Sequence, residues 1–210
     1  MRCCLHCRCG RSGVSRRRVV LRLAMKARRA SKPLRSRVVL PLQQVVQQPM
    51  FPVKVLGASG FWDNCLEDVA AARKSVFFGS LAFDNSKLLS KLLGALARGV
   101  KVEVLVDRAS LEQEVAPRQR ERLLKLKEKG AKIYVAGGRS YKRVFGTEGR
   151  PGNYHAKTMV VDGVTAYVGS PNHTNNSLVN GEVAVRLSGG AVATDVYNQA
   201  WAEAQRPDSF

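Results

Sequence analysis

We predict an α/β sandwich with a mixed β-sheet, because three observations agree. Short segments rich in Val and Phe alternate with amphipathic segments of helical length along residues 51–135, a pattern typical of strands connected by helices. A later Asp-Gly pair between alternating apolar segments predicts a β-hairpin, which adds antiparallel strands. The chain has 210 residues, 45% of them hydrophobic, so it can form a core of ordinary size.

The expected elements follow one another in order. Strands are expected where Val and Phe concentrate or alternate, at residues 51–56, 74–83, 100–107 and 131–135. Helices are expected where apolar residues recur at helical spacing, at residues 63–73 and 87–98, and a charged helix is expected at residues 116–129. The first helix is expected to start at Asp63, after a turn at residues 57–60, and the second is expected to start at residues 84–86. Gly99 is expected to end the second helix and Gly130 the third.

The hairpin at residues 153–172 carries polar side chains suited to chemistry. His155 and Lys157 are two residues apart on its first expected strand, so both side chains project from one face. The return strand ends at Gly169-Ser170, with Asn172 beyond it, near the start of the hairpin. An imidazole, an ammonium, a hydroxyl and an amide that converge in this way suit the binding of a phosphoryl group.

This spacing resembles the motif of the phospholipase D superfamily. The motif positions, H-x-K-x4-D-x6-G-S-x-N, are His155, Lys157, Asp162, Gly169, Ser170 and Asn172. Asn180 and Glu182 lie downstream, where the family often has an acidic partner for the histidine. The preceding elements also match the superfamily fold, including residues 98–102 and Asp107-Arg108. The resemblance implies a single phospholipase D-like domain in residues 51–210; the alternative is an ordinary hairpin whose histidine and lysine face solvent.

The expected chemistry is metal-independent phosphodiester hydrolysis through a phosphohistidine intermediate. A histidine that attacks phosphorus divides one difficult displacement into two easier steps. Glu182 is expected to orient the His155 ring, whereas Asp162, in the hairpin turn, is more supportive than chemical. No cofactor is expected, because residues 63–210 contain no metal-ligand cluster. The expected catalytic residues are His155, Lys157, Asp162 and Glu182, and the expected phosphate-binding residues are Lys157, Ser170 and Asn172.

The number of histidines predicts a homodimer. The chain has three: His6 in the basic N-terminal segment, His155, and His173, which lacks the motif context and is expected at the rim of the site. A second histidine has to protonate the leaving oxygen, so a second copy of His155 is required. A two-fold homodimer would bring both copies to one shared cleft. Single-motif members of the superfamily, notably bacterial endonucleases and the mitochondrial cardiolipin hydrolase group, are similar in this respect.

The positive charge is concentrated at the N-terminus. The net charge is +19, but residues 1–62 hold 14 Lys/Arg and no acid, whereas residues 63–210 hold 21 Lys/Arg against 16 acids. Residues 1–50 are expected to be a disordered targeting leader, because Arg-rich, acid-free composition is typical of an organellar transit peptide, mitochondrial more than plastid. The alternative is a solvated basic tail on a cytoplasmic protein. No segment has the about 18 apolar residues that a transmembrane span needs.

Cysteines cluster in the same segment. Cys4 and Cys7 are spaced as a zinc ligand pair, but the cluster has no second half. Zinc binding and acylation are both open readings, and neither is favoured. Cys65 is expected to be an unbridged thiol in the core or at the surface. The cluster comprises Cys3, Cys4, Cys7 and Cys9, with His6 among them.

A glycine-rich segment at residues 137–153 directly precedes His155 and is expected to form a lip of the active cleft. A basic lip with aromatic side chains suits either a nucleic-acid backbone with stacked bases or an anionic lipid headgroup. A solvated loop is the alternative. The expected lip residues are Arg139, Tyr141, Lys142 and Arg143.

Three functions follow from these features. Phospholipase D-type cleavage of an anionic phospholipid such as cardiolipin is favoured by the organelle-like leader. An endonuclease that cuts single-stranded nucleic acid is favoured by the basic lip. A non-catalytic phosphate-binding scaffold is the reading of another class, and the intact motif argues against it. We expect the first.

Overall fold

The strands of the described chain form one mixed sheet. The computed structural model describes residues 51–140 and 151–209. The sheet order is β1-β8-β7-β6-β2-β3-β4-β5, and β9 pairs with β4. The strands are β1 (Val53–Gly57), β2 (Ser75–Ser80), β3 (Lys101–Asp107), β4 (Lys132–Ser140), β5 (Pro151–Asn153), β6 (Thr158–Val161), β7 (Thr165–Gly169), β8 (Val183–Ser188) and β9 (Gln205–Ser209).

Parallel and antiparallel pairing divide the sheet into two regions. β2, β3 and β4 are parallel to one another, and every other pairing among the described strands is antiparallel. β6 therefore begins at the edge where β2 ends. The predicted α/β sandwich with a mixed sheet is confirmed. The helices are α1 (Ala58–Ala71), α2 (Ser86–Ala97), α3 (Arg108–Glu112), α4 (Gln119–Glu128) and α5 (Gly190–Glu203), with a 3-10 turn at Asn176–Leu178.

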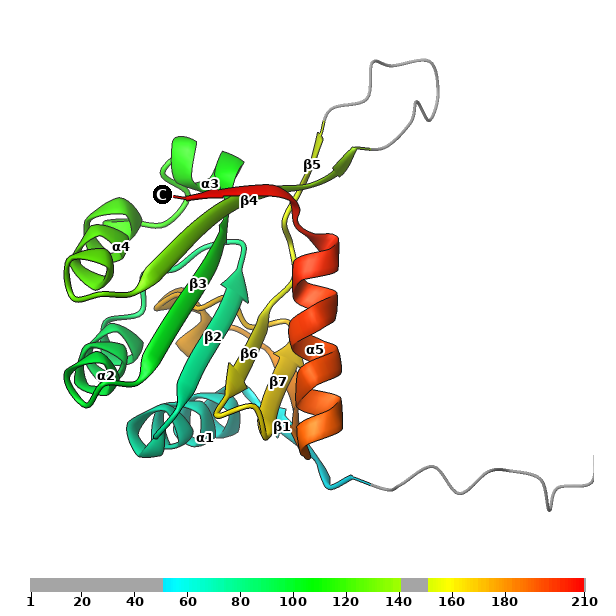
Figure 1. Ribbon diagram of the computed structural model, residues 1–210. Helices are drawn as coiled ribbons and strands as arrows, with labels where there is room; N and C mark the ends of the chain where they lie inside the picture. Colours follow the sequence, from blue (N-terminus) through cyan, green and yellow to red (C-terminus); the bar gives the residue numbers. More distant parts are fainter. Residues whose placement is uncertain (1–50, 141–150, 210) are drawn as a thin grey trace, which may run out of the picture. The chain divides into compact units, whose positions relative to one another are not determined.

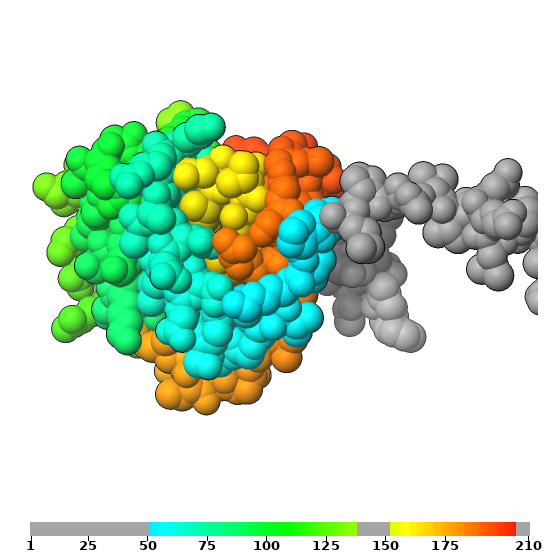
Figure 2. Space-filling model, turned by 90° about the horizontal axis from the view of Figure 1, so that it is seen from below, coloured from blue at the N-terminus to red at the C-terminus, as the bar shows by residue number. Residues whose placement is uncertain are grey.

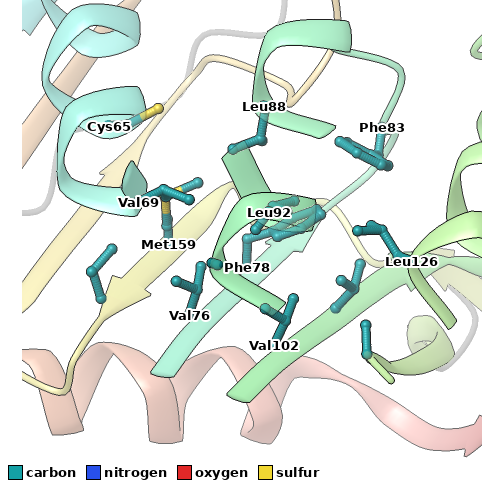
Figure 3. Packing of buried hydrophobic residues seen from close by; sticks show 14 of the residues in the cluster. Cys65, Val69, Val76, Phe78, Phe83, Leu88, Leu92, Val102, Leu126 and Met159 are labelled. Atoms are coloured by element: carbon teal, nitrogen blue, oxygen red, sulfur yellow. The ribbon is translucent and has the colours of Figure 1, made fainter. Parts of the chain in front are cut away.

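Helices cover both faces of the sheet. α1, α2 and α4 lie on one face and α5 lies on the other (Figure 1). Figure 3 shows the first interface, where Leu92 of α2 and Phe78 of β2 pack together and are fully buried. On the second face, the Phe77 ring lies 4.9 Å from that of Tyr197 in α5. Each such large apolar side chain contributes about 1.5–3 kcal/mol through burial.

Several predicted boundaries agree with the structure. Asn85 caps α2 by accepting a hydrogen bond from the Leu88 amide at 2.8 Å. Gly99 follows this helix with φ +83°, as its predicted end requires. Asp162 and Gly163 both have positive φ, 54° and 69°, as the predicted Asp-Gly hairpin turn requires. Figure 2 views the end of the molecule that carries this turn, which lies at the surface.

Other boundaries were predicted wrongly. Residues 57–60 were expected to be a turn and Asp63 a helix cap, but α1 begins at Ala58. The reason is that Phe61, Cys65 and Val69 recur at four-residue spacing and bury one stripe of this longer helix. Cys65 is buried and free, and burial raises the pKa of its thiol.

The segment between β3 and β4 also differs from its prediction. One helix was expected over residues 116–129, but a short α3 comes first and α4 begins only at Gln119. Asp107 caps α3, because its carboxylate accepts the Ser110 amide at 2.7 Å. Glu114 and Arg118 have φ of 51° and 58°, so the chain between the two helices leaves helical geometry twice.

Candidate active site

His155 and Lys157 meet where β5 passes into β6. Both residues precede the first residue of β6, so the strand predicted to carry them begins later than expected. The Lys157 ammonium nonetheless lies 2.7 Å from His155 Nδ1 and 2.9 Å from Nε2, and it donates to the His155 carbonyl at 2.8 Å. The His155 side chain is exposed, whereas Lys157 is 9% exposed. A buried charge thus supports a ring that solvent can reach.

The protonation states of this pair suit an attacking imidazole. Burial and then the Lys157 charge lower the pKa of His155, and the Asp107 carboxylate opposes them. The ring is therefore mostly neutral at pH 7 and has one unprotonated nitrogen. Burial also lowers the pKa of Lys157 to about 8, against the opposing charge of Glu182. The ammonium is still mostly charged at pH 7 and can attract a phosphate oxygen.

The hydroxyl of Ser170 is held at the end of β7, beside this pair. The Gly169 amide donates to the Lys157 carbonyl at 3.3 Å, and the Ser170 amide donates to the Val183 carbonyl at 3.0 Å. These bonds join the end of the hairpin to the start of β8. An added Cβ at Gly169 would lie 2.6 Å from the Ala184 Cα, so only glycine allows this approach without a shift of the backbone.

Glu182 contacts Ser170. Ser170 Oγ donates to the Glu182 carboxylate and accepts the Val183 amide at 3.1 Å. Among the described residues no hydrogen bond joins Glu182 to His155, the partner that the sequence suggested. Glu182 instead orients the Ser170 hydroxyl and acts on Lys157 through its charge. Asn172 lies near the same loop, and its buried Oδ1 has no hydrogen-bond partner among the described residues.

Asp162 lies at the other end of β6, in the hairpin turn. Its carboxylate accepts hydrogen bonds from the Arg73, Lys74 and Ser75 amides at 2.7–3.1 Å. Partial burial acts to raise the pKa of Asp162, but these bonds hold it below its ordinary value. Its geometry is that of an anchor which fixes the hairpin to the start of β2.

His173 was expected at the rim of the site, and this is wrong. It is 1% exposed and lies in a cluster of aromatic rings, with the Phe78 ring 4.9 Å away and those of Phe61 and Trp62 within 6.5 Å. Neither ring nitrogen has a hydrogen-bond partner among the described residues. Burial, with a smaller contribution from Lys157, lowers the pKa of His173 to about 3. It is a neutral core residue with no access to a substrate.

Two residues that support His155 were missed as parts of the site. The buried Asp107 carboxylate accepts the Tyr154 amide at 2.6 Å and so fixes the backbone directly before His155. The Tyr154 side chain is itself buried, and its hydroxyl occupies the space that a Cβ at Gly79 would need. Gly79 lies in a buried strand, and a glycine in a strand interior often marks such a close approach.

The predicted lip lies mostly outside the described residues. Arg139 belongs to β4, but its side chain is not described, and neither are Tyr141, Lys142 and Arg143. Within residues 51–140 and 151–209 there is no group of three or more acidic, His or Cys side chains that could hold a metal ion. The described helices include none that is both long and apolar enough to cross a bilayer.

The fold and the site together define a phospholipase D-like domain with a single histidine motif. Residues 65–203 match the family described as "Cardiolipin synthase, PLD-like domain". The chain therefore belongs to this family, within the phospholipase D superfamily.

Individual relatives agree with this assignment. The chain is 29% identical over 144 residues to a protein named Phospholipase D from Rickettsia bellii, and the match covers 68% of the chain and 63% of that relative. NucT from Helicobacter pylori has a similar structure, with a TM-score of 0.66 and 17% identity over 77% of this chain and 100% of that one. The phospholipase D family member Nuc from Salmonella typhimurium gives a TM-score of 0.61 and 18% identity, over 77% and 99%. At these identities the two structures show the fold alone.

Proposed function

We propose that this protein is a metal-independent phosphodiesterase that cleaves an anionic phospholipid, such as cardiolipin, through a phosphohistidine intermediate. The observation that carries the proposal is the exposed His155 ring with the Lys157 ammonium 2.7 Å from its Nδ1. A neutral imidazole beside a buried positive charge combines a nucleophile with a binding group for the phosphate that it attacks.

The first step forms a bond between a ring nitrogen of His155 and phosphorus and breaks the bond to the leaving alkoxide oxygen. Lys157 stabilises the negative charge on the nonbridging oxygens, and Ser170 adds to this by turning its hydroxyl from Glu182 to the phosphate. The alkoxide takes a proton from the partner subunit's His155, which acts here in its protonated imidazolium form and becomes neutral. That histidine then removes a proton from water, the hydroxide attacks phosphorus, and His155 leaves as a neutral ring.

A second copy of the chain is needed because no other described histidine can supply this proton. A row of cross-strand neighbours, Val55, Val185 and Val168, lies on one sheet face and ends beside the site. Val55 is 71% exposed, and Val183, next to Glu182, is 63% exposed. A two-fold partner that covers this face would bury these valines and bring its His155 to the same cleft.

The choice of a phospholipid substrate is supported by the names of the family and of a relative that the chain matches. The family description names cardiolipin synthase, and the Rickettsia relative is named Phospholipase D. The chain spans about three fifths of the length of that relative. The Arg-rich leader adds support for an organellar location, mitochondrial before plastid, where anionic lipids are at hand.

A nuclease is the second candidate. It is favoured by the four basic residues of the segment before His155. They are Arg139, Lys142, Arg143 and Arg150.

The test is to incubate the full-length protein, with a chelator, in parallel with cardiolipin vesicles and with labelled single-stranded RNA and DNA. Release of phosphatidic acid supports the proposal, and shortened oligonucleotides support the nuclease. His155→Asn is the matched control and should lower either activity at least about 1,000-fold, because the covalent step is lost. If the wild-type protein cleaves neither substrate, the phosphodiesterase proposal fails, and the hypothesis of a non-catalytic phosphate-binding scaffold is favoured.

A further inference from the structure

The positive charge of the described domain is concentrated on two neighbouring helices. Residues 86–98 and 118–132, which contain α2, α4 and their C-terminal ends, hold ten of the 21 Lys/Arg of residues 63–210 but only two of the 16 acids. The remainder of residues 63–210 therefore carries 11 bases and 14 acids. Arg122 of α4 donates to Ser86 of α2 at 3.2 Å, so the helices are in contact, and both lie on the face opposite α5 (Figure 1).

Four lysines of this face have no partner within residues 51–140 and 151–209. They are all exposed, and none forms an ion pair or a side-chain hydrogen bond with any residue that the structure describes. In each helix the two lysines are four residues apart and lie on one side, about 6 Å apart along the axis. No acid occurs within α2, and α4 contains two, Glu121 and Glu128. They are Lys87 and Lys91 of α2 and Lys125 and Lys129 of α4 and its end.

We propose that this α2–α4 lysine surface binds the anionic surface of a lipid bilayer. Lysines that have no partner among the described residues act as separate point charges, and each adds to the attraction of an anionic membrane. Leu124, 43% exposed, lies next to Lys125 and can enter the headgroup region as these ammonium groups approach it. The surface shares no residue with the site around His155.

A lipid surface fits better than nucleic acid for a reason of composition. Residues 86–98 and 118–132 contain no Phe, Trp or Tyr, so the surface cannot stack bases. Proteins that track single strands combine charge with such stacking. The phospholipid substrate proposed above agrees with a lipid surface as the ligand of these lysines. The inference rests on that proposed function only in taking the anionic ligand to be a lipid.

The test has to report on the α2–α4 lysine surface itself, because the basic leader can also bind vesicles and total vesicle binding would not distinguish the two. Hydrogen exchange of the full-length protein is measured with phosphatidylglycerol–phosphatidylcholine vesicles and with phosphatidylcholine alone. We expect slower amide exchange in residues 86–98 and 118–132 with the anionic vesicles only. The variant K87Q/K91Q/K125Q/K129Q should lose this protection, and its partition into the vesicles should fall about tenfold or more.

A control of equal charge is R16Q/R17Q/R18Q/R28Q, in which the same number of charges is removed from the leader. It should keep the protection of both helices. Unchanged exchange in the helices while the wild-type protein sediments with anionic vesicles would overturn the inference, and so would protection by single-stranded RNA in place of vesicles. Hydrolysis of a soluble phosphodiester, equal in both variants, separates this outcome from a failure of the proposed catalysis.

Discussion

At the scale of single residues, two titratable side chains, His155 and Lys157, lie in contact and have to be in different protonation states. The Lys157 ammonium is held beside the His155 ring, and burial lowers the pKa of both side chains. Above the pKa of His155 the ring is free to attack, and below the pKa of Lys157 the ammonium is charged. Both conditions hold together only in a limited range of pH, which extends upward to about 8.

Binding of a substrate analogue should report the upper limit. A phosphonate monoester, which keeps a single negative charge throughout, should bind more weakly as the pH rises through about 8, because Lys157 loses its proton there. In Lys157→Arg this decrease should disappear, since a guanidinium stays charged. Titration calorimetry from pH 6 to pH 10 measures the affinity of both proteins for the phosphonate. A wild-type affinity that stays constant through this range would contradict the role of Lys157 as the charge that binds phosphate.

His173 should make the protein sensitive to acid. Its pKa is about 3 in the fold and about 6.5 when unfolded, so the unfolded chain binds the proton between these values and stability falls as the pH drops below 6.5. Between pH 7.5 and pH 4.5 this residue should cost about 2–3 kcal/mol of unfolding free energy. His173→Phe keeps an aromatic ring and should remove that part of the decrease. Urea unfolding of both proteins at the two pH values measures this decrease in the free energy of unfolding. An equal decrease in the wild-type protein and in His173→Phe would show that His173 is not responsible.

At the scale of elements, the hairpin is fixed at both ends. Gly169 and Ser170 join one end to β8, and the Asp162 carboxylate joins the turn to the start of β2. The position of His155 therefore depends on contacts on either side of β6. The motif aspartate belongs to the anchor, and its distance from the site along β6 separates it from the reacting atoms.

Asp162→Ala should therefore destabilise the fold while the folded fraction stays active. Three amides lose a charged acceptor, which should cost about 1–3 kcal/mol at neutral pH. The cost should begin to shrink as the pH falls below about 4, where the unfolded chain binds a proton at Asp162, and should shrink until the pH passes the lowered pKa of the folded carboxylate. Urea unfolding and hydrolysis per folded molecule give both quantities. Full stability with lost hydrolysis would instead make Asp162 a chemical group.

Sequence patterns predicted the elements whose signals are local. The apolar face of α2, its Asn85 cap and the Asp-Gly turn each depend on a few adjacent residues, and each was found as expected. Asp107 and Gly79 act on Tyr154 across the sheet, and such contacts leave no local pattern. α5 was not predicted, and its interface with Phe77 forms only when the chain returns to the second face.

The site was predicted to a similar extent. The fixed spacing of the motif identified His155, Lys157 and Ser170, which the structure brings to one loop region. The partner of Glu182 and the burial of His173 could not be predicted, because both depend on how β8 and the aromatic cluster pack. An isolated histidine in a sequence carries no sign of whether it faces solvent or the core.

At the scale of the whole molecule, one chain holds half of the proposed machinery. The described residues contain two histidines, His155 and the buried His173, so the proposed mechanism takes its proton donor for the leaving group from a second chain. The exposed valines of β1, β7 and β8 give a face for that chain beside the site. The central claim is therefore that two copies of His155 act in one cleft.

The most direct measurement is the activity of wild-type protein co-expressed in equal amount with His155→Asn. If each cleft needs both histidines, only dimers of two wild-type chains are active, and random pairing leaves about one quarter of the activity of the same total amount of wild-type protein. If each chain worked alone, about one half would remain. A quarter is the result that this account predicts, and a half would contradict it.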